Sequence, residues 1–277
     1  MRTNWNQYLS RDYFAEFSRQ HVIVAGGAQG IGKSLAGAFQ WLGAKVSVLD
    51  RVSPLDEDGA FSNLSSDNYQ FQTVDLVNNK ERSKALEQVV DGFGPPHVFI
   101  STVGLDKRVP IEEFDETSLG ELFAVNFTAS VMTARDVMNS MRKGAGGAIC
   151  LFTSLHGIGL YECGGLGYGG AKAALNNSIM HLAQFAGQDN VATNIIRVFG
   201  FCPGWVQTDN QLRFDDDEFE KARVNQLVPL LLLPEAMVAP VVFLLSNRAP
   251  FFTGEIFQFT GGERNFSQAP ADRSRTS

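Results

Sequence analysis

Tyr168 and Lys172 stand four residues apart in the segment Y-G-G-A-K. If this segment is helical, side chains at i and i+4 lie on one face, so the lysine ammonium group can approach the phenol. A tyrosine is a poor base at its ordinary pKa of about 10. A cation about 4 Å away, at an effective dielectric constant near 20, contributes about 4 kcal/mol, enough to lower this pKa to about 7. The pair is therefore a candidate proton-transfer group, although a tyrosine and a lysine at this spacing also recur by chance.

A glycine-rich turn follows the first apolar run of the sequence. The residues H-V-I-V-A (21–25) are typical of a strand, and A-G-G-A-Q-G-I-G (25–32) leads directly into a helical pattern. The missing side chains at Gly26, Gly30 and Gly32 let the backbone approach a pyrophosphate at the helix N-terminus. The spacing is GxxxGxG rather than the general GxGxxG. Its place between a strand and a helix nevertheless predicts dinucleotide binding.

Asp50 ends the second expected strand, about 20 residues past the turn, where a dinucleotide-binding fold places the adenosine ribose. A carboxylate there accepts hydrogen bonds from the ribose hydroxyls of NAD and repels the 2′-phosphate of NADP. Arg51 could in principle hold that phosphate, but it is adjacent to the acid, and Gln29 brings no positive charge to the turn. We therefore expect NAD as the cofactor, with a solvated strand-end aspartate as the alternative.

Short apolar runs alternate with longer segments of helical apolar spacing along the whole chain. The expected strands are residues 21–25, 45–50, 70–75, 97–101, 147–154, 193–199 and 255–259. The expected helices are residues 31–42, 80–93, 119–141, 168–185 and 234–245. This alternation predicts an α/β, doubly wound Rossmann fold with a seven-stranded, mainly parallel sheet and helices on both faces. We expect a single domain over residues 20–262, an N-terminal extension over 1–19 and a polar C-terminal tail over 263–277.

The composition disfavours several classes of protein. The 277 residues carry a formal net charge of -7, and Lys and Arg are scattered, so we expect no nucleic-acid partner. No apolar run approaches the roughly 20 residues of a membrane span, and residues 1–20 lack the pattern of a secretory signal, so we expect a cytoplasmic protein without a membrane partner. Cys150, Cys163 and Cys202 are odd in number and lack ligand spacing, so we expect neither disulfides nor a metal site.

With these pieces in order, residues 20–262 resemble the short-chain dehydrogenase/reductase family in its compact single-domain branch. The resemblance depends on an ordered set of motifs rather than on any one of them. In chain order these are A-G-G-A-Q-G-I-G, Asp75-Leu76, Asn126, Ser154, Y-G-G-A-K, P-G-W-V-Q-T (203–208), T-G (253–254) and G-G (261–262).

The resemblance implies a catalytic tetrad of Asn126, Ser154, Tyr168 and Lys172. In such a tetrad the tyrosine is the general acid or base, the lysine also binds the nicotinamide ribose, the serine binds the substrate oxygen, and the asparagine holds a water that connects the lysine to solvent. The cofactor residues that we expect are Gly26, Gln29, Gly30, Ile31, Gly32, Asp50, Arg51, Asp75, Leu76, Ser101, Val103, Gly104, Tyr168, Lys172, Pro203, Gly204, Val206 and Thr208.

The sequence departs from the family pattern at two cofactor segments. Ala25 stands where the family usually has a threonine whose hydroxyl ties the turn to neighbouring structure. The block S-T-V-G (101–104) stands where the family has N-N-A-G. Both departures concern the geometry of the cofactor site and leave the proton-handling residues intact.

The substrate site is expected in the loops around the tetrad, at Leu105, His156, Tyr161, Glu162 and Trp205. The resemblance implies an NAD-dependent oxidoreductase that interconverts a small secondary alcohol, such as a cyclic polyol, a sugar-like alcohol or an alicyclic ring, and its ketone. The alternatives are a ketone reductase working in the reverse direction and a dinucleotide-binding sensor or scaffold without catalysis. Relatives associate through long helices, so we expect a homotetramer or a homodimer.

Overall fold

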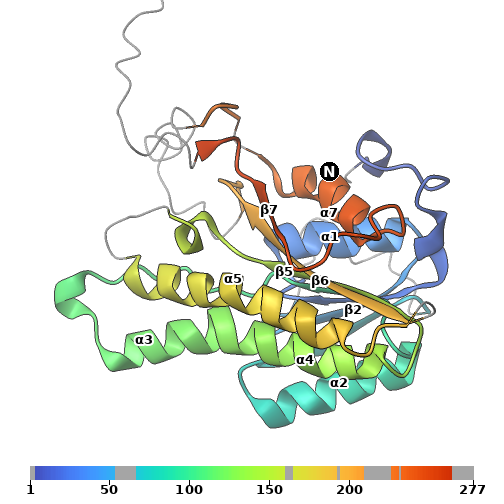
Figure 1. Ribbon diagram of the computed structural model, residues 1–277, viewed down its shortest axis with the longest axis horizontal. Coiled ribbons are helices and arrows are strands. Elements are labelled where there is room, and N and C mark those ends of the chain that lie inside the picture. The colour runs from blue at the N-terminus through green and yellow to red at the C-terminus, as the bar shows by residue number, and fades with distance from the viewer. Residues whose placement is uncertain are drawn as a thin grey trace, which may run out of the picture.

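The protein is built around one parallel sheet (Figure 1). The structure is a computed structural model that describes residues 4–53, 67–159, 165–191, 194–208, 226–230 and 232–263. Its seven strands lie in the order β3-β2-β1-β4-β5-β6-β7, and each neighbouring pair is parallel. The strands are β1 (His21–Ala25), β2 (Lys45–Asp50), β3 (Tyr69–Thr73), β4 (Val98–Ser101), β5 (Gly146–Phe152), β6 (Ile195–Pro203) and β7 (Ile256–Phe259). The predicted seven-stranded doubly wound fold is confirmed.

Helices cover both faces of this sheet (Figure 1). Helices α1 (Gly30–Trp41) and α7 (Val238–Leu245) share one buried apolar core, and α2 (Asn79–Phe93), α4 (Ser130–Met141) and α5 (Leu166–Gly187) share the other. The shorter elements are α3 (Glu116–Phe123), the π-helix η4 (Ala124–Ala129), and the 3-10 helices η1 (Trp5–Gln7), η2 (Ala15–Arg19), η3 (Ile111–Glu113), η5 (Leu155–Gly157) and η7 (Pro234–Met237). Within the described ranges, no helix has the length and apolarity that crossing a membrane requires.

The central strands are buried on both faces, as a parallel sheet between two helical layers requires. All five residues of β1 are buried, which explains the uninterrupted apolar run over 21–25. The expected single helix over 119–141 is instead α3, η4 and α4 in succession. This difference matters for the site, because the π-helical turn contains Asn126.

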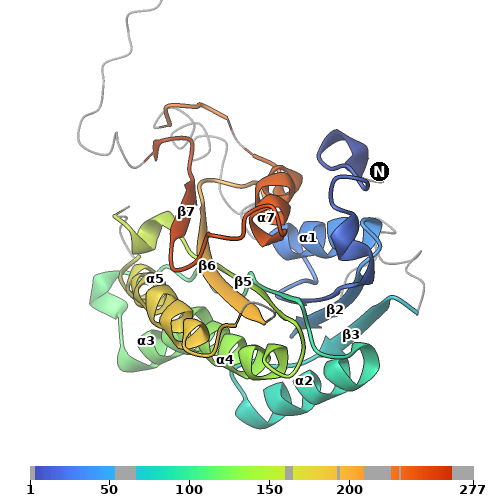
Figure 2. The ribbon, with the colours of Figure 1, turned by 45° about the vertical axis from the view of Figure 1, so that its right-hand side comes forward.

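Residues 4–19 pack onto the α1 side of the sheet (Figure 2). Phe17 is 1% exposed, and its ring lies edge-on to Phe39 of α1 at a centroid distance of 5.0 Å. The carbonyl of Tyr13 accepts hydrogen bonds from the Arg248 guanidinium. The segment expected as an extension therefore contributes buried side chains to the same core as the sheet.

A neutral histidine is built into the amino-terminal edge of the sheet. His21 is 1% exposed, its Nδ1 donates to the Gly94 carbonyl at 2.7 Å, and its Nε2 lies 2.7 Å from the Ser47 hydroxyl. The same hydroxyl accepts from Gln70 Nε2 at 2.7 Å, so the serine proton is directed at the imidazole. Burial, with smaller effects of His97 and Lys45, lowers the pKa of His21 to about 4 despite the Gly94 carbonyl.

This histidine predicts a loss of stability in mild acid. Between pH 6.5 and about 4 the unfolded chain binds a proton at His21 that the folded protein does not, so stability falls as the pH falls through that window. The expected loss is about 3 kcal/mol in the free energy of unfolding. Urea unfolding across this range should show a pH slope that shrinks in His21→Asn and persists in His181→Gln, an exposed control. An NMR titration of His21 with its midpoint near 6.5 would contradict the prediction.

Candidate active site

The glycine turn, residues 25–32, is packed so closely at Gly26 and Gly32 that a side chain cannot be added at either position. Gly26 has a φ of +80°, which favours glycine. A Cβ on Gly32 would lie 2.2 Å from the Gly26 carbonyl oxygen and 2.6 Å from Thr102 Oγ1. The backbone of the turn therefore stands bare at the start of α1, which is the arrangement that cradles a pyrophosphate.

Thr102 ties this turn to the neighbouring strand. Its hydroxyl lies 3.1 Å from the Ala25 carbonyl and 3.0 Å from the Gly26 carbonyl. The parallel pairing of Ala25 with Ser101 brings the next residue beside the turn. The hydroxyl that Ala25 lacks is thus replaced by one from the end of β4. The sequence motifs did not indicate this role of Thr102. The parallel register of β1 and β4, which pairs Ala25 with Ser101, would have indicated it.

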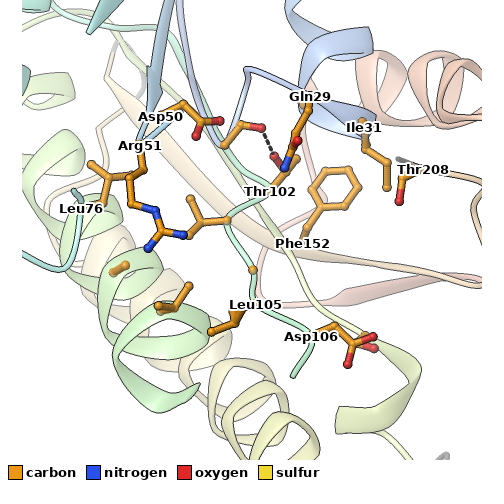
Figure 3. A pocket seen from close by; sticks show the side chains of 18 of the residues that line it. Gln29, Ile31, Asp50, Arg51, Leu76, Thr102, Leu105, Asp106, Phe152 and Thr208 are labelled. Atoms are coloured by element: carbon orange, nitrogen blue, oxygen red, sulfur yellow. Dashed lines mark hydrogen bonds between the residues drawn. The ribbon is translucent and has the colours of Figure 1, made fainter. Parts of the chain in front are cut away.

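A cavity of about 380 Å³ runs from the turn to the carboxyl ends of β4, β5 and β6 (Figure 3). This volume lies in the range of small-molecule sites. Asp50 and Arg51 stand at one end of the view and Asp106 at the other. The Asp50 carboxylate accepts from the backbone N–H of Ala28 at 2.9 Å and of Val52 at 3.1 Å, so it is fixed beside the turn where a ribose would lie.

Most of the expected cofactor residues line this cavity. They are Gly26, Gln29, Gly30, Ile31, Gly32, Asp50, Arg51, Asp75, Leu76, Val103, Gly104, Tyr168, Lys172, Pro203, Gly204, Val206 and Thr208. A Cβ on Gly30 would come 3.3 Å from Thr208 Cγ2, so the 203–208 loop lies directly across from the turn. Ser101 is not on the cavity wall, because its buried hydroxyl lies 2.9 Å from that of Ser130.

Three of the four expected catalytic side chains meet on the cavity wall. Tyr168 and Lys172 lie one turn apart on α5, and Ser154, which follows β5, lies on the same cavity wall. Lys172 is 3% exposed, and its Nζ donates to the Phe152 carbonyl at 3.0 Å and lies 5.9 Å from the centroid of the tyrosine ring. Serine, phenol and ammonium groups thus face one small volume.

Asn126 stands behind this wall and fixes its backbone. Its Oδ1 accepts from Leu105 N at 2.9 Å, and its Nδ2 donates to the carbonyls of Leu105 and Leu122 at 2.9 and 3.0 Å. A Cβ on Gly104 would lie 3.3 Å from Asn126 Oδ1 and 3.7 Å from Lys172 Nζ. The π-helical turn, a geometry frequent at functional sites, therefore presents Asn126 to the loop that lies against Lys172.

Burial dominates the protonation of the tyrosine and lysine. Burial raises the pKa of Tyr168 to about 12; Asp106 and Cys202 add to this, and the Ser154 hydrogen bond and Arg108 oppose it. Burial lowers the pKa of Lys172 to about 8. The expectation that Lys172 lowers the pKa of Tyr168 to about 7 is therefore wrong for the protein without its cofactor. The phenolate loses its hydration in the cavity, while the ammonium group is directed at the Phe152 carbonyl.

The expected substrate residues are distributed unevenly. Leu105 lines the cavity. His156 lies outside its wall, with Nδ1 3.4 Å from Ser154 Oγ and its ring edge-on to Tyr168 at 5.4 Å between centroids. Trp205 donates its indole N–H to Glu263 Oε1 at 2.8 Å and does not line the cavity either. Tyr161 and Glu162 lie outside the described residues.

Asp106 is a cavity residue that sequence reasoning did not single out. It stands two residues past Gly104, in a loop without regular spacing, where a charged side chain is usually solvated. In this structure the anchoring of Leu105 by Asn126 directs the loop along the cavity, and nothing in the pattern of the sequence indicates that bond.

Known proteins resemble this chain in sequence and in fold. A family model described as short chain dehydrogenase matches residues 20–218. The probable galactose dehydrogenase GalD of Rhizobium meliloti (strain 1021) is 26% identical over 260 residues, covering 92% of this chain and 98% of the relative. The 3-alpha-(or 20-beta)-hydroxysteroid dehydrogenase of Mycobacterium tuberculosis is 28% identical over 243 residues, covering 87% and 88% of the two chains. The crystal structure of gox2181 superposes with a TM-score of 0.80 at 20% identity, covering 90% of this chain and 98% of that one, which supports the same fold.

Proposed function

The chain belongs to the short-chain dehydrogenase family, a family of NAD(P)-dependent oxidoreductases, and on that premise we propose that it uses NAD to interconvert a small secondary alcohol and its ketone, with Tyr168 as the general acid or base. The substrate classes that we propose are a cyclic polyol, a sugar-like alcohol or an alicyclic ring. The observation that carries the proposal is the single cavity that joins Asp50 and the glycine turn to Ser154, Tyr168 and Lys172.

The chemistry divides between the cofactor and the chain. When bound, an oxidised nicotinamide supplies the hydride acceptor and a positive charge near the phenol. Ser154 holds the substrate oxygen by a hydrogen bond and stabilises its developing charge. Tyr168 takes the hydroxyl proton during oxidation and returns it during reduction. Lys172 is held by the Phe152 carbonyl near the phenol. Its charge, together with that of the bound nicotinamide, would oppose the effect of burial, which raises the pKa of Tyr168.

The cofactor residues fit a dinucleotide. The turn offers bare backbone at a helix N-terminus, and Asp50 stands at the ribose position with its carboxylate fixed by two backbone N–H groups. The carboxylate is the feature that supports NAD over NADP. The exposed Arg51 beside it is the feature that would favour NADP.

Reduction of a ketone is the second candidate direction, and one observation favours it. With a pKa raised to about 12, Tyr168 is protonated at neutral pH, the state that a general acid requires. Asp50 supports the oxidative direction, because reductive metabolism usually draws on NADPH. Both directions use the same residues.

Formation of NADH, followed by absorbance, tests the proposed function. The panel comprises cyclic alcohols, polyols, sugars and hydroxysteroids, the last two because relatives named for a sugar and a steroid resemble this chain. We expect turnover with NAD on at least one small secondary alcohol. Binding of NAD without turnover of any alcohol or ketone in either direction would favour a dinucleotide sensor or scaffold instead.

Asp50→Asn should relax the choice of cofactor. Asparagine keeps the shape and an acceptor for the Ala28 N–H, and it removes the charge that repels a 2′-phosphate. We expect the ratio of kcat/KM with NAD to that with NADP to fall by about 10-fold or more, since a single charged hydrogen bond contributes about 1.5–3 kcal/mol. Asp91→Asn makes the same charge change at an exposed position on α2 and should leave the ratio unchanged. An unchanged ratio in Asp50→Asn would remove the basis for NAD preference.

Association into a homodimer or homotetramer in the cytoplasm is part of the same proposal. The long helix α5, on which Met180 is 60% exposed, is the element that we propose for this interface. Light scattering after size-exclusion chromatography should give a mass at least twice that of the chain. A monomer across the working concentrations would contradict this assembly.

A further inference from the structure

Asp106 places a carboxylate at the catalytic end of the cavity. It lines the same space as Ser154, Tyr168 and Lys172 and stands at the opposite end of the view from Asp50 (Figure 3). Asp50 and Asp75 belong to the expected adenosine end. Asp106 is therefore the acidic residue of the cavity wall nearest to where the reacting alcohol would bind.

The backbone before Asp106 is held rigidly. Both the N–H and the carbonyl of Leu105 bond to the buried Asn126 amide, each at 2.9 Å. Arg108 Nε lies 3.9 Å from Asp106 Oδ1, and the two side chains are 30% and 25% exposed. A fixed loop and a nearby cation keep the carboxylate at this position, and a carboxylate has about four acceptor positions, so it can pair with an arginine and also accept from a ligand.

The charge of Asp106 is felt at the phenol that would meet the substrate oxygen. Asp106 raises the pKa of Tyr168, and Arg108 lowers it. An ionised carboxylate accepts hydrogen bonds and donates none, so a substrate group that faces it must be a donor. Its charge-assisted bond to a hydroxyl is stronger than a neutral one, and it repels an anionic substrate group.

We propose that Asp106 is a specificity-determining residue that accepts a hydrogen bond from a second hydroxyl beside the reacting one. The preferred substrates are then vicinal diols, as in a sugar or a cyclic polyol, rather than isolated alcohols or hydroxy acids. This inference builds on the proposed dehydrogenase function and selects one substrate class within it.

Pairs of alcohols that differ by the neighbouring hydroxyl test this inference. Suitable pairs are cyclohexane-1,2-diol with cyclohexanol and galactose with 2-deoxygalactose. We expect wild-type kcat/KM to favour the diol member of at least one pair by about 10-fold or more, because a site built to bind a hydroxyl rejects an analogue that lacks it. Asp106→Ala should bring that ratio close to one, and Asp106→Asn should give an intermediate value, since its amide oxygen still accepts.

Two further readouts separate specificity from a structural role. In Asp106→Asn, the pH profile for oxidation of the diol should move to lower pH, because one negative charge near Tyr168 is lost while Lys172, His156, Cys202 and Arg108 remain around it. Glu121→Gln removes a carboxylate that pairs with Lys107 on the surface and should change neither the ratio nor the profile. An equal loss on both members of each pair, with an unmoved profile, would show that Asp106 only supports the loop and would overturn the proposal.

The same experiments distinguish a failure of this inference from a failure of the proposed dehydrogenase function. Turnover of alcohols by the wild type without preference for a neighbouring hydroxyl overturns the inference and leaves the dehydrogenase function standing. Binding of NAD without turnover of any alcohol overturns both.

Discussion

Tyr168→Phe should oxidise its best alcohol about 1,000-fold more slowly than the wild type, within the range of 10²–10⁴ that general acid–base catalysis contributes. Phenylalanine keeps the ring against His156 and removes the one oxygen that exchanges a proton with the substrate. NAD binding should be retained, because the glycine turn and Asp50 are unchanged. The loss should therefore appear in kcat rather than in cofactor affinity.

The pH dependence of the same variant gives a second readout. The wild-type oxidation rate should rise with pH on the alkaline side, because the pKa of Tyr168 is raised and the phenolate fraction grows with pH. The phenylalanine variant should show no such rise. Tyr13→Phe, at a tyrosine that is 49% exposed and packs beside Arg248, is the matched control and should behave as the wild type. A Tyr168→Phe enzyme that keeps more than a tenth of its activity would exclude the tyrosine as the proton-transfer group.

Gly32→Ala should abolish detectable NAD binding. The new Cβ would lie 2.2 Å from the Gly26 carbonyl oxygen and 2.6 Å from Thr102 Oγ1. Because these two atoms are hydrogen-bonded to each other, neither can move aside alone, and the turn must change shape. A distortion that costs about 3–4 kcal/mol, at the upper end of overpacking, corresponds to a loss of roughly 100- to 1,000-fold in affinity. Fluorescence titration with NADH measures it directly.

Gly37→Ala is the control for the glycine variant. Gly37 lies on the same helix, and a Cβ there would meet Trp5 Cζ2 at an ordinary van der Waals distance of 3.4 Å, with no closer contact among the described residues. Since alanine is favoured over glycine in a helix by about 1 kcal/mol, this variant should bind NADH normally and melt at the same or a higher temperature. Equal loss of NADH binding in both variants would show that any added side chain on α1 impairs binding. It would contradict the claim that the close packing of the turn at Gly32 is the cause.

The fold could be predicted from the sequence because the buried parallel strands are short apolar runs. Strands β1 and β2 begin and end where the pattern places them, at 21–25 and 45–50. The strand boundaries differ from the expected ones where tertiary contacts determine them. The strand expected over 193–199 is β6, which continues to Pro203 because its last residues pair with β7. The sequence did not indicate the π-helical turn over Ala124–Ala129, because the apolar spacing of this segment continues that of the helices on either side.

The site was predicted in its residue types more fully than in its geometry. Spacing indicated that Tyr168 and Lys172 share a face, but it could not indicate that the Phe152 carbonyl would hold the ammonium group or that burial would raise the tyrosine pKa. The S-T-V-G block was interpreted as a departure from the family, yet Thr102 supplies the tie to the turn that Ala25 lacks. Such roles depend on which backbone groups the neighbouring strands bring within reach, and residue types alone do not specify that.

Transfer of deuterium from an alcohol to the cofactor tests the central claim most directly. The best alcohol of the panel, deuterated at its carbinol carbon, is incubated with the enzyme and NAD, and the reduced cofactor is analysed by mass spectrometry. The proposed reaction predicts NADH that carries the label in the wild type and a far slower appearance of label in Tyr168→Phe. Reduced cofactor without the label, or no reduced cofactor while NAD is bound, would contradict hydride transfer at this site.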